Sequence, residues 1–138
     1  MKKLLMSTVC TFMILYVHAQ TKPVKIVFDV TSADHETHQS AIRHVKFMAS
    51  AYPDSQFEVV IYSGSVEMAL KDKSVVADDI IKLAENKNVS FKVCEQTLKH
   101  KKIDKSELLP NVETVPDGIL EIVSRQSEGW GYIKESHH

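Results

Sequence analysis

The sequence has little of the residue types that build linkers, repeats and disulfide-rich scaffolds. Its 138 residues include four glycines, four prolines and two cysteines. Hydrophobic residues make up 43% and charged residues 25%, which are ordinary values for a globular domain. These figures exclude low-complexity, collagen-like and multi-pass membrane chains, and the length favours one domain with a real core.

The chain also lacks a surplus of positive charge. Seventeen lysines and arginines face eighteen aspartates and glutamates, which gives a formal net charge of −1. Proteins that bind nucleic acids need basic side chains to neutralise phosphates. We therefore expect no nucleic acid among the partners of this protein.

Three motifs of common enzyme classes are missing. No glycine-rich phosphate loop follows the first apolar run, so nucleotide binding is not expected. The segment Ser63-Gly64-Ser65 is not a Gly-x-Ser-x-Gly nucleophile elbow. The sequence holds no Cys-x-x-Cys pair, which excludes a self-contained dithiol oxidoreductase. We expect no cofactor.

The first 19 residues have the pattern of a secretion signal. Lys2 and Lys3 precede an apolar run from 4 to 17, and Val17-His18-Ala19 offers small residues at a cleavage site. We expect cleavage after Ala19, no membrane span afterwards, and a periplasmic or secreted protein of residues 20–138 that forms a single domain. A retained anchor is the alternative, but the run is shorter than the roughly 20 residues that cross a bilayer.

Removal of the leader leaves one cysteine, Cys94, because Cys10 lies in the apolar run and leaves with it. The remaining chain has 15 basic residues (17 minus Lys2 and Lys3) and 18 acidic ones. In an oxidising compartment structural cysteines come in pairs. A lone one is buried and inert, bridged to another chain, or reactive.

Strand and helix patterns alternate along the rest of the chain. Apolar, β-branched runs predict five strands, and residues at helical spacing predict helices between them, one of which has Pro116 in its first turn. The expected strands are 24–30, 56–62, 89–93, 112–115 and 129–133, and the expected helical segments are 36–52, 66–70, 74–87, 95–101, 104–109 and the segment that begins at 116. Strands joined by helices run parallel. We expect a three-layer α/β sandwich, a flavodoxin-like and mostly parallel five-stranded sheet with helices on both faces.

Reactive groups collect at the carboxyl ends of the strands in such sheets. That edge is expected to carry 31–38, 63–65 and 94–97. Cys94 is the candidate catalytic residue, and His35, Ser63, Gly64 and Thr97 are the candidate supporting pocket, with His35 as a possible proton shuttle.

Two interpretations of Cys94 stay open. A thiol between a strand and a helix faces unsatisfied amide groups, and Lys92, Lys99, Lys101 and Lys102 would favour the thiolate, while Glu95 would oppose it. Alternatively, Cys94 fills space in the core as a small hydrophobic side chain. Position alone does not decide between these interpretations.

Two further clusters invite weaker interpretations. His35, His38 and His44 could ligate a metal, but their spacing is not that of a zinc site, and we expect no metal. The run Lys99-His100-Lys101-Lys102 could bind an acidic partner, although such runs are usually solvated helix faces.

Several segments together resemble the DsrE/DsrF-like family. They are the strand 24–30, the strand and glycine 57–64, the cysteine segment 89–98, the Leu-Pro-x-Val segment 109–112 with Gly118, and the ending 129–133. The resemblance covers nearly the whole chain after the leader. It implies a flavodoxin-like fold and a homo-oligomer, often a trimer or hexamer.

The resemblance also implies a function, because members with the cysteine carry sulfur. Cys94 would hold a transient persulfide, taken from a sulfur donor protein and handed to an acceptor protein. The relay members that this chain resembles are cytoplasmic, whereas this chain has a leader. The alternative function is a non-catalytic oligomeric binding module with a structural Cys94.

Overall fold

A computed structural model describes residues 22–136. The expected leader and its cleavage site after Ala19 lie outside these residues. No helix within 22–136 has both the length and the apolar character needed to cross a membrane.

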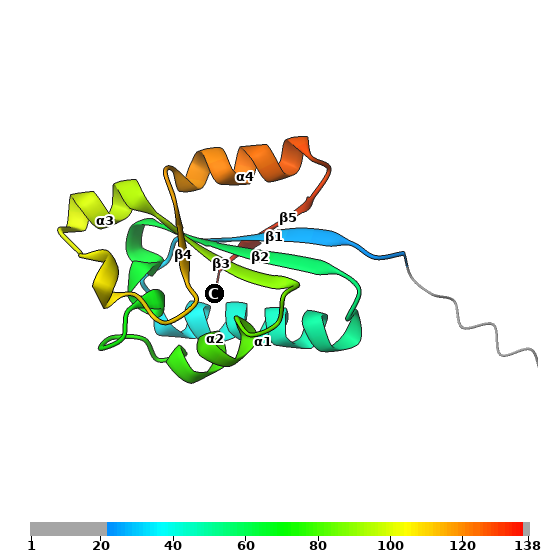
Figure 1. Ribbon diagram of the computed structural model, residues 1–138, viewed down its shortest axis with the longest axis horizontal. Helices are drawn as coiled ribbons and strands as arrows, with labels where there is room; N and C mark the ends of the chain where they lie inside the picture. The colour runs from blue at the N-terminus through cyan, green and yellow to red at the C-terminus, as the bar shows by residue number, and fades with distance from the viewer. Residues whose placement is uncertain (1–21, 137–138) are drawn as a thin grey trace, which may run out of the picture.

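Five parallel strands form one sheet in the order β4-β3-β2-β1-β5. The expected α/β class is confirmed (Figure 1). The strands are β1 Lys25–Val30, β2 Gln56–Ile61, β3 Val89–Cys94, β4 Glu113–Val115 and β5 Gly131–Glu135. The α-helices are α1 His35–Ala51, α2 Ala77–Leu83, α3 Glu95–Lys101 and α4 Gly118–Ser127, and the 3-10 helices are η1 Ser63–Ala69 and η2 Lys105–Glu107.

The strand order explains which helix covers which face. The chain adds β2, β3 and β4 in one direction along the sheet, so right-handed crossovers place α1 and α2 on the same face. The chain then returns from β4 across the whole sheet to β5, which lies beside β1, and this reversal places α4 on the opposite face. Figure 1 shows α1 and α2 below the sheet, α4 above it and α3 beyond its left-hand end.

The face under α1 and α2 holds the main hydrophobic core. The residues that β1, β2 and β3 present to this face are apolar and mostly buried, and the expected apolar stripe of α1 packs against them. They include Phe28, Phe57 and Phe91 from three neighbouring strands, with Ile42 and Val45 of α1. This side therefore supplies most of the hydrophobic stabilisation.

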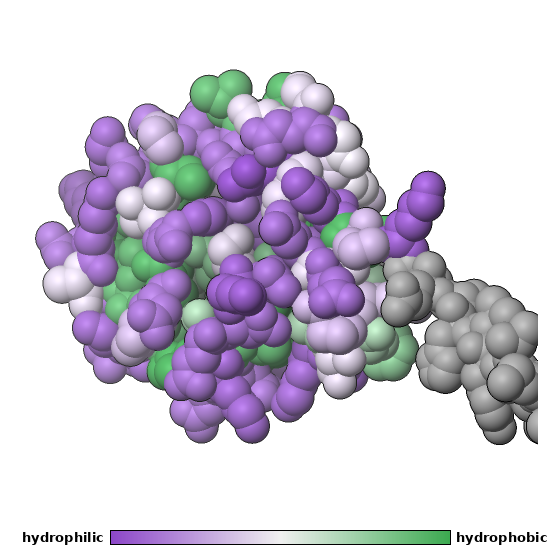
Figure 2. All heavy atoms as spheres, turned by 45° about the vertical axis from the view of Figure 1, so that its right-hand side comes forward, coloured by the Kyte–Doolittle hydropathy of each residue, from purple (hydrophilic) through white to green (hydrophobic). Residues whose placement is uncertain are grey.

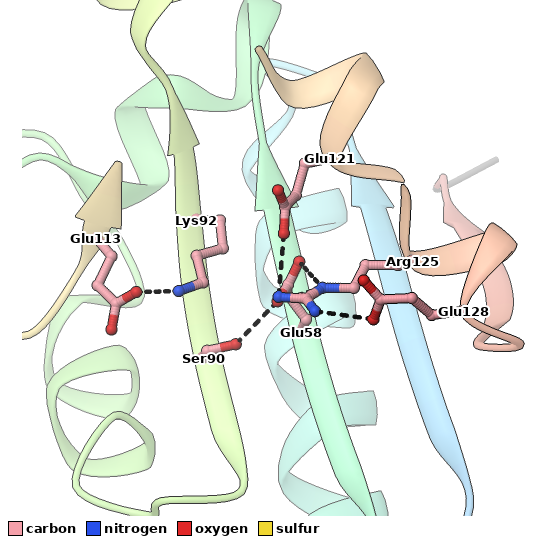
Figure 3. Close-up of polar contacts among 7 residues, drawn as sticks. All are labelled: Glu58, Ser90, Lys92, Glu113, Glu121, Arg125 and Glu128. Carbon is pink, nitrogen blue, oxygen red and sulfur yellow. Dashed lines mark hydrogen bonds and ion pairs between the residues drawn. The ribbon is translucent and has the colours of Figure 1, made fainter. Parts of the chain in front are cut away.

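The face under α4 is different. Its apolar cluster consists of Val27, Val60 and Ile122, with Tyr62 and Trp130 packed against it. Polar and charged side chains fill the rest of this face, with Glu58 and Ser90 at its centre (Figure 3). The sheet is thus an apolar layer on one side and a mixed layer on the other.

The start of α4 corrects one detail of the sequence prediction. Pro116 does not occupy the first turn, because Asp117 caps the helix and the helix begins at Gly118. The Asp117 carboxylate accepts hydrogen bonds from the amide groups of Ile119 and Leu120, at 2.9 and 3.0 Å. An aspartate in this position stabilises the first turn, so the proline is left outside the helix.

Candidate functional site

Cys94 lies at the junction of β3 and α3. It is the last residue of the strand and the N-cap residue of the helix, and its side chain makes no capping hydrogen bond. Its relative exposure is 5%. The thiol is therefore almost completely buried.

A cavity of about 400 Å³ adjoins Cys94 at the carboxyl edge of the sheet. The ends of β2 and β3, the helix α3 and the first turn of α4 all contribute to its wall. The lining residues are Tyr62, Ser63, Cys94, Gln96, Thr97, His100, Lys101, Asp117 and Ile119. This volume lies in the range of small-molecule sites.

Two of the candidate pocket residues, Ser63 and Thr97, line this cavity with Cys94. The Ser63 amide donates a hydrogen bond of 3.0 Å to the Thr97 hydroxyl, which ties the end of β2 to α3. Ser63 has a φ of 59°, a left-handed conformation that is uncommon outside glycine. The bond to Thr97 holds this wall of the cavity in place.

Gly118 lets α4 approach Cys94 closely. A Cβ atom at residue 118 would lie 3.2 Å from the Cys94 Cβ and 3.3 Å from the Tyr62 Cβ. These distances are shorter than ordinary carbon contacts. The absence of a side chain at Gly118 is what allows the first turn of α4 to lie over the thiol.

Tyr62 connects the cavity to a buried carboxylate, Asp29. Burial, followed by the charge and hydrogen bonding of Asp29, raises the pKa of Tyr62 to about 12. Asp29 also accepts a 2.5 Å hydrogen bond from the Tyr132 hydroxyl and a 3.2 Å bond from the Lys134 ammonium. The Tyr62 phenol beside the thiol is therefore an even weaker acid than an ordinary tyrosine.

Most of the charged residues that are close to Cys94 in the sequence are paired with other residues or lie away from the cavity. Glu95 accepts hydrogen bonds from Lys105 at 2.6 Å and Thr114 at 2.9 Å, and the bond to Lys105 is the main reason that its pKa is lowered. Lys92 is paired with Glu113. Of the four lysines expected to act on the thiol, only Lys101 lines the cavity.

Gly64 and His35 are not among the residues that line the cavity. A Cβ atom at Gly64 would lie 2.9 Å from the Thr31 oxygen and from the Ala33 nitrogen, so this glycine allows two loops to pack. His35 begins α1, which covers the opposite face of the sheet from α4. The structure therefore does not bring His35 together with Cys94.

The histidines of α1 have other partners. His38 is buried, its Nε2 lies 2.8 Å from the Ser32 oxygen, and burial lowers its pKa. His44 Nδ1 lies 2.9 Å from a carboxylate oxygen of the buried Glu135. Within residues 22–136, no group of three or more His, Cys, Asp or Glu side chains is arranged to hold a metal ion.

Tyr62, Asp117 and Ile119 line the cavity but were not among the pocket residues predicted from the sequence. Tyr62 follows β2 directly, so the strand-end rule that pointed to Ser63 could also have found it. Asp117 and Ile119 reach the cavity through α4. The position of α4 depends on the pairing of β5 with β1, because α4 connects β4 to β5 across the sheet. No local sequence pattern shows this pairing.

These features define an α/β protein with a single thiol at the carboxyl edge of a parallel sheet. The sequence pattern of the DsrE/DsrF-like family matches residues 25–134. The chain belongs to this family, as the resemblance indicated.

Solved structures show the same fold. A protein of unknown function from Methanobacterium thermoautotrophicum, MTH1491, is 32% identical, with a TM-score of 0.75 over 80% of this chain and 98% of its own. The ychN protein of E. coli is 14% identical, with a TM-score of 0.68 over 83% and 99% of the two chains. BT1422 from Bacteroides thetaiotaomicron, also of unknown function, is 12% identical, with a TM-score of 0.66 over 80% and 93%. No curated protein matches the chain.

Proposed function

We propose that this protein is a sulfur carrier that holds a transient persulfide on Cys94. The observation that carries the proposal is the place of the thiol, which lies at the end of β3 beside a cavity of about 400 Å³. Membership of the DsrE/DsrF-like family supports it, because the resemblance to this family implies that Cys94 carries sulfur.

The chemistry of loading needs only the thiol of this chain. The Cys94 thiolate attacks the outer sulfur of a donor persulfide, R–S–SH, and the S–S bond of the donor breaks. The donor leaves as a thiolate with the electron pair of that bond and takes up a proton. The sum is R–SSH plus Cys94–SH giving R–SH plus Cys94–SSH, with no net oxidation.

The cavity wall suits a polar sulfur anion. Ser63, Thr97 and Gln96 bring hydroxyl and amide groups to the cavity, and Lys101 brings a positive charge. Tyr62 is a neutral phenol, as any tyrosine is at neutral pH, and its pKa is raised further, to about 12. These groups can bind a persulfide anion, whereas the carboxylate of Asp117 on the α4 side of the same wall accepts hydrogen bonds from two amide groups of α4.

Export and assembly are part of the same proposal. The leader pattern supports a periplasmic or secreted protein cut after Ala19, with donor and acceptor proteins in that compartment. Tyr132 and Ile133 on the edge strand β5 are exposed, and this exposure supports a homo-oligomer, such as a trimer or hexamer, whose interface would cover them. Light scattering during size-exclusion chromatography measures the number of subunits.

The test of the proposal is the intact mass of residues 20–138 after incubation with inorganic polysulfide. We expect a gain of whole sulfur atoms that a reductant removes and that Cys94→Ser lacks. A protein that gains no sulfur, although its thiol is reduced, would contradict the proposal.

The burial of Cys94 favours a second candidate, a non-catalytic oligomeric binding module. At 5% exposure the thiol could serve as packing beneath Gly118, while the cavity binds a small ligand. In that case Cys94 reacts with iodoacetamide only after unfolding, and Cys94→Ser leaves ligand binding unchanged. Alkylation of the native protein separates the two candidates.

A further inference from the structure

Two short helices flank the opening of the cavity beside Cys94, and they differ in character. The last turn of α3 carries Lys99, His100 and Lys101, and Lys102 follows it. The first turns of α4 expose Ile119, Leu120 and Val123, at 61%, 61% and 51%. His100, Lys101 and Ile119 also line the cavity, so both surfaces continue into it.

Two lysines at the end of α3 form no ion pair within the described part of the chain. Lys101 and Lys102 are exposed, and neither forms an ion pair with another residue of 22–136. Lys99 differs from them, because its positive charge contributes to the lowered pKa of Glu95. Asp117 is the acidic residue of the cavity wall, and its carboxylate is bonded to two amide groups of α4. A positive surface thus stands on a chain that has more acidic than basic residues.

The apolar side of α4 has no partner in the same part of the chain. Only Gly118 and Ile122 of this helix are buried. In Figure 2, hydrophobic side chains reach an otherwise mostly hydrophilic surface at the top, over α4. Exposed apolar side chains beside an opening favour binding of another molecule.

We propose that Lys101 and Lys102 of the α3 end, together with Ile119 and Leu120 of α4, bind an acidic segment of the donor protein that delivers sulfur to Cys94. The proposal rests on the sulfur-carrier function and adds the chemistry of the partner. Charge complementarity selects an acidic segment, and the apolar side chains of α4 select one with an apolar residue beside its cysteine. The cavity volume leaves room for the donor cysteine and its neighbours.

The experiment uses two synthetic peptides of equal length, each with one cysteine converted to a persulfide. In one peptide, aspartate, glutamate and leucine flank the cysteine, and in the other, lysine replaces the acidic residues. The rate of sulfur transfer to residues 20–138 is measured by mass spectrometry, with inorganic polysulfide as the donor without a docking segment. We expect the acidic peptide to react about tenfold faster at low salt and to lose this advantage in high salt.

Variants locate the effect. Lys101→Glu with Lys102→Glu should abolish the preference for the acidic peptide. Lys102→Glu alone, at a residue that does not line the cavity, should reduce this preference while leaving loading from polysulfide within about twofold of the unmodified chain. The matched control is Lys82→Glu with Lys87→Glu, which changes the net charge equally at exposed positions outside the cavity and should keep the preference. A serine in place of the peptide leucine should slow transfer, because the contact with Ile119 and Leu120 is lost.

Several results would overturn the proposal. Equal rates for both peptides would show that charge does not select the donor. An equal loss with polysulfide in Lys102→Glu would show that this lysine attracts small anions and not a docking segment. Dissociation of an oligomer by the same variant would assign the surface to a second copy of the chain.

A binding measurement distinguishes failure of the carrier function from failure of the docking surface. If no donor loads Cys94, the proposed function fails, and the docking surface is then tested with Cys94→Ser and fluorescent thiol forms of both peptides. Binding of the acidic peptide alone supports the surface, and equal or absent binding rejects it.

Discussion

The two faces of the sheet are built from the same five strands, yet they serve different purposes. On the face of α1 and α2, neighbouring strands contribute Phe28, Phe57 and Phe91 to one dry layer. On the face of α4, a single helix covers a layer with Glu58, Asp29 and Cys94 in it. The alternation of side chains along a strand lets each strand contribute to both. Stability is concentrated on the first face, and the candidate chemistry is on the second.

Replacement of Phe91 by alanine should have the largest effect on stability. Phe91 is fully buried, so its loss leaves a cavity and should lower the free energy of unfolding by about 3–5 kcal/mol. The neighbour Ser90, on the other face, is the control, because its hydroxyl is 3.4 Å from Glu58 and its replacement by alanine should cost less than about 1 kcal/mol. Urea unfolding measures both, and equal losses would remove the distinction between the faces.

Arg125→Met should have the next largest effect. Arg125 Nη2 lies 2.9 Å from a carboxylate oxygen of Glu58, which is 1% exposed, so the variant leaves a buried carboxylate without its partner (Figure 3). We expect a loss of about 2 kcal/mol, since Arg125 is partly solvated. Methionine keeps apolar contact with Trp130, whose ring centre lies 4.9 Å from the guanidinium carbon.

The double variant Glu58→Gln with Arg125→Met is the control for this pair. It removes both charges, so it should be more stable than Arg125→Met alone. A double variant as unstable as the single one would show that the arginine acts through packing.

Glu58 should also give a smaller, pH-dependent effect. Burial raises the pKa of its carboxyl above the usual 4.5, even with Arg125 beside it. The folded state therefore binds this proton more tightly than the unfolded state, and the resulting stability is present at low pH and lost as the pH rises through the raised pKa. The difference in unfolding free energy between the unmodified chain and Glu58→Gln should shift in favour of the unmodified chain as the pH falls towards 4.5. A difference that does not change with pH would contradict this assignment.

The smallest effect is expected from Asp29→Asn, which should change ionisation more than stability. The hydrogen bond to Asp29 is the leading reason that the pKa of Tyr132 is raised to about 12, whereas burial is the leading reason for Tyr62. The pKa of Tyr132 should therefore fall further than that of Tyr62. Ultraviolet titration of tyrosinate measures the two pKa values, and Tyr132→Phe assigns the signals. An equal fall of both pKa values would contradict the assignment of different leading causes to the two tyrosines.

The sequence predicted the layers of this fold well, because hydrophobic periodicity reports local structure. The stripe of α1 and the strands before Ser63 and Cys94 are confirmed in the structure. The start of α4 was misplaced at Pro116, since the pattern does not show that the Asp117 side chain bonds to the following amides. Glu58 gave a signal that was overlooked, as a charged residue inside the apolar run of β2 needs a partner in the fold.

The candidate site could be predicted only in part. Cys94, Ser63 and Thr97 follow the strand-end rule, which depends on nothing beyond strand direction. The opposite wall of the cavity comes from α4, and its position depends on the long return of the chain across the sheet. His35 was grouped with Cys94 because both follow strands, but β2 lies between β1 and β3, and α1 leaves from the other face.

The pairing of β1 with β5 also determines when the fold can be completed. Ile26 is paired with Gly131, so the first and last strands are neighbours although almost the whole domain separates them in sequence. One edge of β1 stays without its partner strand until the last residues of the domain have been synthesised. Contacts of such long sequence separation slow folding, because the chain must close a large loop before they form. A chain cut before residue 131 would leave the open side of β1 free to pair with other chains.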